Sequence, residues 1–335
     1  MTREDIAPAG EGTAVRVLVS NETDDAIGVR LLSQIGGVEV VPYDPNTKQL
    51  TDEQQQVDVL IPPYRSSHRP IPLLQQLPHL RLVQLLSAGI DEWADDVPAH
   101  VLLASARGAH AGPVSEWVLS AILTLYRQWP ALVRYQDAGT WAHRLVDADT
   151  LRGKRVAVVG AGAIGTAVAA RLEPFDAAIT LVASRERPGV HAASELPGLL
   201  GDHQVVVITA PLTDQTEGLV DARFLAAMPD GALLVNAGRG RIVNTDALVN
   251  ELKAGRLRAA LDVTDPEPLP SDHPLWTCPG VIVSPHMART VPGTPALCYE
   301  VAAQQVSALV AGTTPPNAVQ RGAACLRETQ TSSAG

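Results

Sequence analysis

Three short polar segments hold the residues of this chain that are best suited to acid–base chemistry. They are Asn236–Gly240, which contains Arg239, Asp262–Pro268, which contains Glu267, and Ser284–His286. Each segment follows a short apolar run that predicts a strand. Taken singly, an Arg, Glu or His at a strand end is more often structural or solvated than catalytic. If the three strand ends converge, a guanidinium can bind a carboxylate while an imidazole moves a proton, which is what interconverting a carbonyl and an alcohol needs.

A glycine-rich segment upstream of these residues predicts that the chain binds a dinucleotide. A β-prone run leads directly into this segment, and a helical pattern follows it; the segment reads Gly160-Ala161-Gly162-Ala163-Ile164-Gly165. In this context Gly160 allows a tight turn, Gly162 lets the backbone approach a pyrophosphate, and Gly165 lets the helix lie close to the strand. Free amides at the helix start would face the phosphates. The alternative is a purely structural glycine turn.

The residues after the next strand bear on which dinucleotide is bound. An NAD enzyme of this fold carries Asp or Glu there, about 20 positions after the glycines, to bind the ribose 2′-hydroxyl. This chain has Ser184 and Arg185, followed by Glu186 and Arg187. Without an acidic residue at Ser184, and with two arginines nearby, a 2′-phosphate would be accepted and its charge matched. We therefore predict a preference for NADPH over NADH; the alternative is that the arginines are solvated and Glu186 binds the ribose.

The elements that must position these groups form two successive α/β units. Apolar runs alternate with helical stretches, which is typical of parallel sheets with helical crossovers. The predicted strands cover 14–19, 38–41, 57–61, 80–86, 101–105, 156–159, 179–183, 204–209, 232–236, 259–262 and 281–284, with helical stretches at 24–35 and 113–126. The second of these helices is expected to bridge two domains, and the polar tail 327–335 is expected to be disordered.

Length, charge and cysteine content exclude several classes of protein. The 335 residues suffice for two α/β domains, and a net charge of −10 with scattered Lys and Arg argues against nucleic-acid binding. Three cysteines without a C-x-x-C pair, and no His cluster at metal spacing, indicate neither a disulfide framework nor a metal site. A reducing cytoplasm fits best. No signal-peptide pattern or membrane-length apolar run occurs, so we expect a soluble protein with no membrane partner.

The motifs, in their order, resemble those of the D-isomer-specific 2-hydroxyacid dehydrogenases, and in particular of glyoxylate and hydroxypyruvate reductases. The matching segments read G-A-G-A-I-G, N-A-G-R-G, D-V-x-x-x-E-P-L and S-P-H. A fifth segment, Leu86–Asp91, resembles the family's substrate-carboxylate loop. The resemblance covers nearly the whole chain and implies an α/β fold of two Rossmann-like domains with parallel sheets. The flavodoxin-like substrate domain would comprise residues 1–108 and 291–335, and the dinucleotide-binding domain residues 109–290.

The resemblance also implies roles for the candidate catalytic residues. Arg239 would bind the carbonyl oxygen and the carboxylate of the substrate, and His286 would act as general acid and base. Glu267 would pair with His286, and a carboxylate beside an imidazole favours the charged form of the ring. The backbone amides of Ala88 and Gly89 would hold the carboxylate from the other side. A Glu in this position argues against the related formate dehydrogenases, which carry Gln there.

Further residues receive cofactor or substrate roles from the same resemblance. Asp262 would contact the nicotinamide end of the cofactor, and residues 209–211 would lie along its adenosine side. The complete predicted cofactor set is Gly160, Gly162, Ala163, Ile164, Gly165, Ser184, Arg185, Thr209, Ala210, Pro211, Ala237, Arg239, Asp262 and His286. Tyr64 and Arg65 are predicted to contact the substrate, because in the family a loop at about this position of the substrate domain contacts the side chain of the substrate. Arg289 either binds a second anionic group of the substrate or caps a surface loop.

The predicted activity is the NAD(P)-dependent reduction of a small 2-oxo acid to a D-2-hydroxy acid, in a cytoplasmic homodimer. The apolar stretch Val114–Trp129 would suit a dimer interface, and a core helix explains it equally well. Phosphite dehydrogenases resemble this triad too, so phosphite is an alternative substrate. A further alternative is a non-catalytic dinucleotide-sensing protein resembling the C-terminal binding proteins, against which the lack of a long disordered regulatory segment argues.

Overall fold

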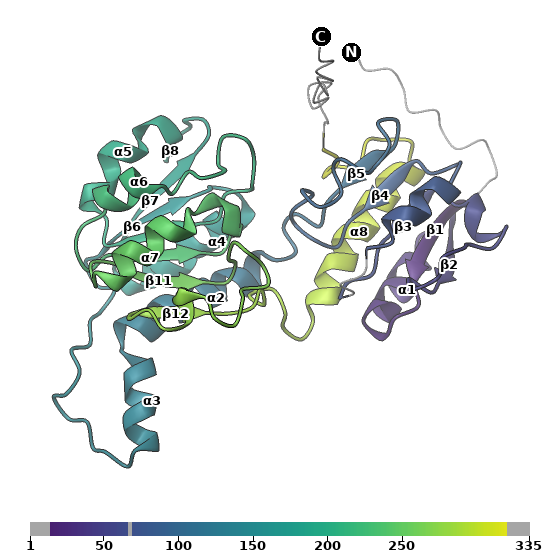
Figure 1. Ribbon diagram of the computed structural model, residues 1–335. Helices are drawn as coiled ribbons and strands as arrows, with labels where there is room; N and C mark the ends of the chain where they lie inside the picture. Colours follow the sequence, from purple (N-terminus) through teal and green to yellow (C-terminus); the bar gives the residue numbers. More distant parts are fainter. Residues whose placement is uncertain (1–13, 66–68, 320–335) are drawn as a thin grey trace, which may run out of the picture. The chain divides into compact units, whose positions relative to one another are not determined.

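The computed structural model describes residues 14–65 and 69–319 (Figure 1). The contacts within the chain divide it into two compact units, the first comprising Met1–Arg107 and Pro295–Gly335 and the second Gly108–Thr294. Each unit is built on one parallel sheet with helices between its strands, so the predicted two-domain Rossmann-like α/β fold is confirmed. The tail 327–335, for which disorder was predicted, lies outside the described residues.

The first unit contains a five-stranded parallel sheet in the order β2-β1-β3-β4-β5. Its strands are β1 (Val15–Ser20), β2 (Val38–Tyr43), β3 (Val59–Ile61), β4 (Leu82–Gln84) and β5 (Leu102–Ala104). This is the 2-1-3-4-5 order of flavodoxin-like sheets. The central strands are buried almost throughout, as a sheet covered on both faces requires. Its α-helices are α1 (Ala26–Leu32) and α8 (Thr294–Val310), whose residues from Pro295 on belong to this unit.

The second unit contains a seven-stranded parallel sheet in the order β12-β11-β10-β9-β6-β7-β8. The strands are β6 (Arg155–Val159), β7 (Ala178–Ala183), β8 (Val190–Ala192), β9 (Val205–Ile208), β10 (Leu233–Asn236), β11 (Arg258–Leu261) and β12 (Val281–Val283). Counted from β6, the order is that of a dinucleotide-binding sheet, 3-2-1-4-5-6, with one further strand. The chain reverses its direction of strand addition between β6 and β9, which places the topological switch point there.

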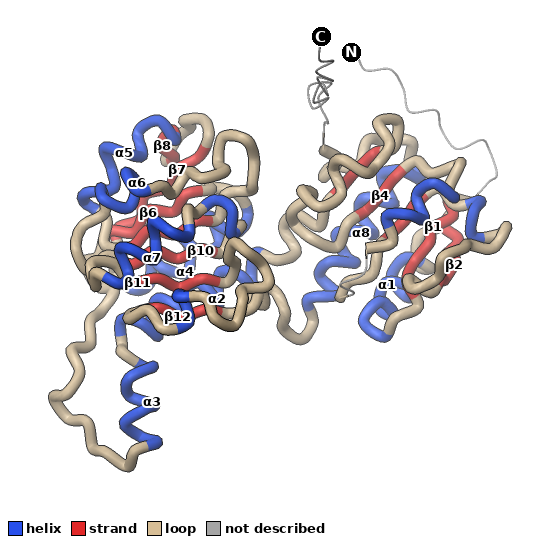
Figure 2. Tube along the Cα trace, in the orientation of Figure 1, coloured by secondary structure: helices blue, strands red, loops and turns tan. Residues whose placement is uncertain are grey.

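Helices cover both faces of this second sheet (Figure 2). They include α2 (Ala111–Tyr126), α4 (Ala163–Leu172), α5 (Leu196–Leu199), α6 (Ala222–Ala227) and α7 (Thr245–Lys253). Short 3-10 turns cover Thr23–Asp25, Gln54–Gln56 and Ile71–Gln76 in the first unit, and Glu173–Phe175, Ala193–Glu195, Leu200–Asp202, Gly240–Ile242 and Pro274–Trp276 in the second. Alternate residues of β6 enter different apolar clusters, because successive side chains of a strand point to opposite faces. Within residues 14–65 and 69–319, no helix has the length and apolarity needed to cross a membrane.

The prediction that the helix over 113–126 bridges two domains is wrong. The first crossing between the units lies at Arg107–Gly108, before α2 begins. Val118, Ile122 and Leu125 of α2 pack into the core of the second unit, against strands of its sheet. The apolar face of α2 is therefore used within its own unit.

Helix α3 (Trp129–Asp137) and the segment that follows it extend away from the sheet of the second unit (Figure 1). No residue of α3 is buried. The side chains of Trp129, Val133, Trp141 and Leu145 are exposed, and Trp141 is 91% exposed. The stretch Val114–Trp129 was expected to suit a dimer interface, and most of it lies in α2. The exposed apolar side chains lie instead on residues 129–145.

Candidate active site

The glycine-rich loop connects β6 to α4 at the switch point. Gly160 has φ of +112°, and a Cβ there would lie 2.4 Å from the amide nitrogen of Ala210. A Cβ on Gly165 would lie 2.0 Å from the carbonyl oxygen of Gly160, so a side chain at either position would collide with backbone. A Cβ on Gly162 would meet nothing within 4 Å, so this part of the loop is open. Gly162 precedes α4, whose first amides have no partner within the helix; these residues fit the pyrophosphate of a dinucleotide.

The loop after β9 lies against the glycine-rich loop. The amide of Thr209 donates to the carbonyl of Val159 at 2.8 Å, and the Thr209 hydroxyl donates to the carbonyl of Gly160 at 2.8 Å. These two hydrogen bonds fix the start of the segment Thr209–Pro211 at the switch point. In open parallel sheets this crevice is where ligands bind.

The segment after β7 brings an arginine to the same loop. The Nη2 of Arg187 donates to the carbonyl of Ala161 at 2.6 Å. Backbone hydrogen bonds between Arg187 and Val190, at 2.8 and 3.1 Å, fix the turn that carries this side chain. Ser184 and Arg185 are exposed at the end of β7. Arg187 therefore contacts the glycine-rich loop. The predicted cofactor set contained the neighbouring Ser184 and Arg185 but not Arg187.

The loop after β10 holds Arg239 through the side chain of Asn236. The Asn236 Nδ2 donates to the carbonyl of Arg239 at 2.9 Å, and the Asn236 Oδ1 accepts from the amide of Gly238 at 3.1 Å. The Nη1 of Arg239 donates to the carbonyl of Gly238 at 2.9 Å. A Cβ on Gly240 would lie 1.9 Å from the carbonyl oxygen of Thr264, so this loop packs against the one after β11. Asn236, which is buried, is a positioning residue that the sequence did not reveal.

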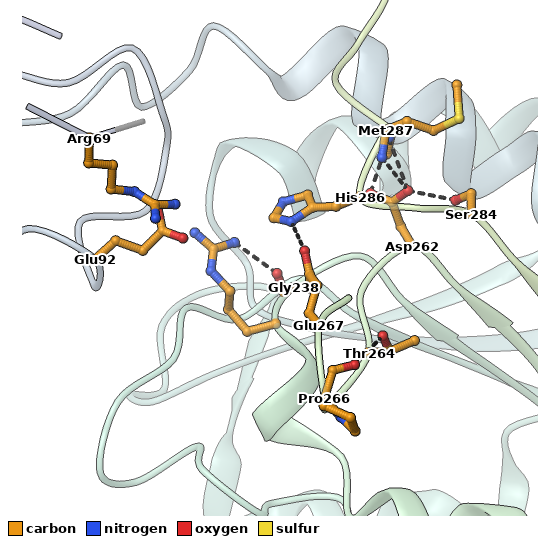
Figure 3. A network of polar contacts seen from close by, with 12 residues as sticks. Arg69, Glu92, Gly238, Asp262, Thr264, Pro266, Glu267, Ser284, His286 and Met287 are labelled. Carbon is orange, nitrogen blue, oxygen red and sulfur yellow. Dashed lines mark hydrogen bonds and ion pairs between the residues drawn. The ribbon is translucent and has the colours of Figure 1, made fainter. Parts of the chain in front are cut away.

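His286 and Glu267 are in direct contact (Figure 3). The Nδ1 of His286 lies 2.6 Å from the Oε1 of Glu267, and the two side chains are 38% and 41% exposed. The hydrogen bond from His286 lowers the pKa of Glu267 below its ordinary value, although partial burial acts in the opposite direction. The charge of Arg239 also lowers this pKa, so the guanidinium lies within electrostatic range of the pair. With Nδ1 held by Glu267, the other ring nitrogen of His286 is the one left to exchange a proton with a ligand.

The carboxylate of Asp262 fixes the segment that carries His286 (Figure 3). It accepts hydrogen bonds from the Ser284 hydroxyl at 2.6 Å, the Met287 amide at 2.9 Å and the Ala288 amide at 3.0 Å. The His286 amide donates to the Asp262 carbonyl at 2.7 Å. His286 itself has φ of +51°, a conformation that non-glycine residues adopt rarely. Asp262, predicted to contact the cofactor, therefore holds the strained backbone of His286 in place.

A buried histidine lies near the two arginines of the site. Burial lowers the pKa of His110 to about 3, and the charges of Arg289 and Arg239 act in the same direction. His110 is therefore neutral at physiological pH. Because both guanidinium groups lie within electrostatic range of this imidazole, Arg289 shares the surroundings of Arg239. The sequence did not reveal His110 as part of these surroundings.

The residues predicted to bind substrate in the first unit follow two neighbouring strands of its sheet. Tyr64 and Arg65 follow β3, and Ala88 and Gly89 follow β4, so all four lie at the carboxyl edge. Ala88 is exposed and Gly89 is half-buried. Tyr64 is buried, and the Nε of Arg65 forms an ion pair with Asp24 at 2.9 Å.

The comparisons with known proteins agree with this geometry. A dinucleotide-type sheet that carries Arg, Glu and His at neighbouring strand ends defines a dinucleotide-dependent oxidoreductase. Residues 119–288 match the sequence profile of the D-isomer specific 2-hydroxyacid dehydrogenase NAD binding domain. The chain belongs to this family and is an NAD(P)-dependent 2-hydroxyacid dehydrogenase.

Individual relatives cover most of the chain. It is 31% identical over 264 residues to a glyoxylate reductase of Thermofilum pendens, covering 74% of this chain and 77% of that protein. It is 32% identical over 260 residues to a glyoxylate/hydroxypyruvate reductase B of Serratia proteamaculans, covering 73% and 79%. A D-isomer specific 2-hydroxyacid dehydrogenase of Xanthobacter autotrophicus Py2, solved with NADPH and MES, is similar with a TM-score of 0.79 and 28% identity, covering 92% and 98%.

Proposed function

We propose that this protein reduces a small 2-oxo acid of the glyoxylate or hydroxypyruvate type to the corresponding D-2-hydroxy acid. The observation that carries the proposal is the 2.6 Å contact between His286 and Glu267, within electrostatic range of Arg239, at the carboxyl edge of a dinucleotide-type sheet. The names of the reductases of Thermofilum pendens and Serratia proteamaculans support this substrate class. In this proposal the first unit binds the substrate and the second unit binds the dinucleotide.

The residues of the site have distinct roles in the proposed reaction. A bound nicotinamide dinucleotide supplies the hydride to the carbonyl carbon. The guanidinium of Arg239 binds the carboxylate and polarises the carbonyl oxygen. For the backbone amides of Ala88 and Gly89 we propose binding of the same carboxylate. The Nε2 of His286 gives its proton to the carbonyl oxygen, which becomes the hydroxyl of the product. Glu267 orients the ring through Nδ1 and stabilises its charged form.

The test of this function is a spectrophotometric assay that follows oxidation of NADPH and of NADH. The substrates are glyoxylate, hydroxypyruvate, pyruvate and a branched-chain 2-oxo acid, and reduction of NADP or NAD with phosphite is measured separately. Fast oxidation with glyoxylate or hydroxypyruvate is the expected result. No turnover with any substrate, together with tight dinucleotide binding, would contradict the proposal and favour a dinucleotide-sensing protein.

We expect Arg187 to determine a preference for NADPH. Its guanidinium lies at the glycine-rich loop, next to the end of β7, where a 2′-phosphate is bound in this fold. Arg187→Ala should raise KM for NADPH by about tenfold or more, the effect of losing a charge-assisted hydrogen bond, and should leave KM for NADH nearly unchanged. Arg185→Ala is the matched comparison. A larger effect on KM in Arg185→Ala, or an equal rise in KM for NADPH and NADH in Arg187→Ala, would show that Arg187 does not bind the 2′-phosphate.

The pH dependence of reduction should depend on Glu267. Because its pKa is lowered, Glu267 stays ionised down to pH values below its ordinary 4.5, and its pairing with His286 is lost only as the pH falls through that lowered value. The rate of reduction should therefore fall in acid as the pH drops through the lowered pKa of Glu267, because protonation of the carboxylate ends its pairing with His286. In Glu267→Gln this fall in acid should be absent, because an amide has no carboxylate to protonate. Identical profiles for the two proteins would contradict this role.

We infer that the protein is a cytoplasmic homodimer. The exposed side chains of Trp129, Val133, Trp141 and Leu145 support an interface on α3 and the segment after it, because several large apolar side chains exposed on one segment are typical of contact sites. Three cysteines in 335 residues, without a C-x-x-C pair, suit a reducing compartment. Light scattering should give twice the mass of the chain for the wild type and a lower mass for Trp141→Glu. A monomeric wild type at micromolar concentration would contradict the dimer.

A further inference from the structure

Asp25 is a fully buried carboxylate in the first unit, 0% exposed, outside the catalytic residues described above. It ends the 3-10 turn Thr23–Asp25 and occupies the N-cap position of α1. An aspartate in this position usually accepts a hydrogen bond from the first turn of its own helix. The side chain of Asp25 makes no such bond. Its carboxylate is used elsewhere.

The carboxylate instead joins two segments that are far apart in the sequence. Its Oδ1 accepts from the amide of Tyr64 at 3.2 Å and from the hydroxyl of Tyr299 at 3.0 Å. The Ser20 hydroxyl is also hydrogen-bonded to it. Tyr64 belongs to the loop after β3, and Tyr299 lies on α8. A Cβ on Gly28 would lie 2.1 Å from the Tyr299 ring, so this glycine of α1 leaves room for the ring beside the carboxylate.

The position of Asp25 in the sheet relates it to a ligand-binding edge. Ser20 is the last residue of β1, and residues 62–65 follow β3, which pairs with β1. Both strand ends lie at the carboxyl edge, where ligands bind in open parallel sheets. Immediately beside Asp25, Asp24 forms the ion pair with Arg65. Two consecutive aspartates thus hold two consecutive residues of the loop after β3.

The charge of Asp25 is costly for the fold. Burial raises the pKa of Asp25 to about 6, although the hydrogen bonds from Ser20, Tyr299 and Tyr64 act in the opposite direction. The other groups that face it cannot neutralise it: Glu22 is negative, and burial raises the pKa of Tyr43 and of Tyr299, so both remain protonated. Above pH 6 the protein keeps a buried negative charge whose contacts are to the loop after β3 and to α8.

We propose that Asp25 is a positioning residue for the substrate: its buried carboxylate holds the backbone of the loop after β3 through the Tyr64 amide and anchors that loop to α8 through Tyr299. The proposal rests on the proposed function, in which the first unit binds the 2-oxo acid, and on the predicted contact of Tyr64 and Arg65 with that substrate. According to this proposal, contacts inside the first unit determine the conformation of the loop after β3. It also explains why an ionised side chain is retained in a core position that a neutral one would fill at lower cost.

The experiment uses the full chain with Asp25→Asn, which preserves shape but removes the charge, and Tyr299→Phe, which removes only the hydroxyl. KM for the 2-oxo acid should rise roughly fivefold or more in Asp25→Asn and less in Tyr299→Phe, with KM for the dinucleotide unchanged. Hydrogen exchange of the peptide containing Tyr64 should become faster in both variants.

Thermal stability separates positioning from a purely structural role. The folded-state pKa of Asp25 lies above that of the unfolded chain, so its proton stabilises the fold fully below pH 3.8, and this stabilisation is lost as the pH rises through about 6. Asp25→Asn lacks the charge, and its Tm at pH 8 should equal or exceed that of the wild type. A higher KM together with an undiminished Tm is the result expected of a positioning residue. A lower Tm with unchanged KM would overturn the proposal.

Asp58→Asn is the matched control, because Asp58 also accepts from a backbone amide, that of Arg16 at 2.9 Å, but lies before β3 rather than after it. It should change neither KM nor the exchange of the Tyr64 peptide. Faster hydrogen exchange of the Tyr64 peptide in Asp25→Asn, with KM for the 2-oxo acid unchanged, would overturn the role of Asp25 in positioning the substrate but not the proposed function. A wild type that turns over no 2-oxo acid overturns the proposed function, and the substrate role of the loop with it.

Discussion

Replacing His286 with Asn should lower kcat for reduction of the 2-oxo acid by about 10²- to 10⁴-fold, the contribution of a positioned general acid. Nε2 of His286 is the ring nitrogen left to protonate the carbonyl oxygen, because Nδ1 is held by Glu267. Asn is the appropriate substitution, since it tolerates the positive φ of 51° better than most residues and keeps the backbone contacts to Asp262. The measurement is steady-state kinetics with the dinucleotide saturating.

The control for this prediction is a second His–Glu pair in the same unit. His191 contacts Glu195 through Nδ1 at 2.9 Å, and both side chains are exposed. His191→Asn should therefore leave kcat unchanged. Binding of NADPH to His286→Asn, measured by fluorescence, should stay close to that of the wild type. An equal loss of kcat and of dinucleotide binding would indicate that His286 is structural and not an acid.

Replacing Arg239 with Gln should lower kcat/KM for the 2-oxo acid by about 10²- to 10³-fold. The guanidinium lies within electrostatic range of the His286–Glu267 pair, and the proposal assigns to it the binding of the carboxylate and the stabilisation of the developing charge on the carbonyl oxygen. Arg239→Lys should recover only part of the loss, because an ammonium group cannot form two parallel hydrogen bonds with a carboxylate. Most of the effect should appear in KM for the acid, with a further loss in kcat.

Arg241→Gln provides the matched comparison for Arg239. Arg241 lies two positions further along the same segment and pairs with Glu217 at the surface. Its replacement should leave kcat/KM within about twofold of the wild type, since exposed ion pairs contribute little. Full activity of Arg239→Lys would show that only a charge is needed at this position. Equal losses at Arg239 and Arg241 would assign the effect to the segment rather than to the guanidinium.

Some residues on which the two predictions depend can be recognised in the sequence, and others cannot. Arg239, Glu267 and His286 stand out because each follows a predicted strand, and parallel strands bring their carboxyl ends to one edge. Asn236 lies in the N-A-G-R-G segment and His110 in a segment without such a motif, and neither segment indicates what these two side chains contact. Their importance follows from what they contact, namely the backbone of Arg239 and the electrostatic surroundings of two arginines.

The sequence by itself determined the parallel α/β architecture, the family and the position of the dinucleotide loop. These features are local or ordered along the chain: β-prone runs, glycines that a tight turn requires, and motifs in a fixed order. The short edge strand β8 was missed because three residues between two turns give too little periodicity to recognise.

Only the tertiary structure decided which side chains meet. It gave Arg187 a hydrogen bond to the glycine-rich loop, and it placed the carboxylate of Asp262 against the amides that follow His286. It buried the apolar face of α2 and left the apolar side chains of α3, Trp129 and Val133, exposed. The physical reason is that a side chain's direction and burial depend on what packs against it from distant parts of the chain, and no local pattern records those neighbours.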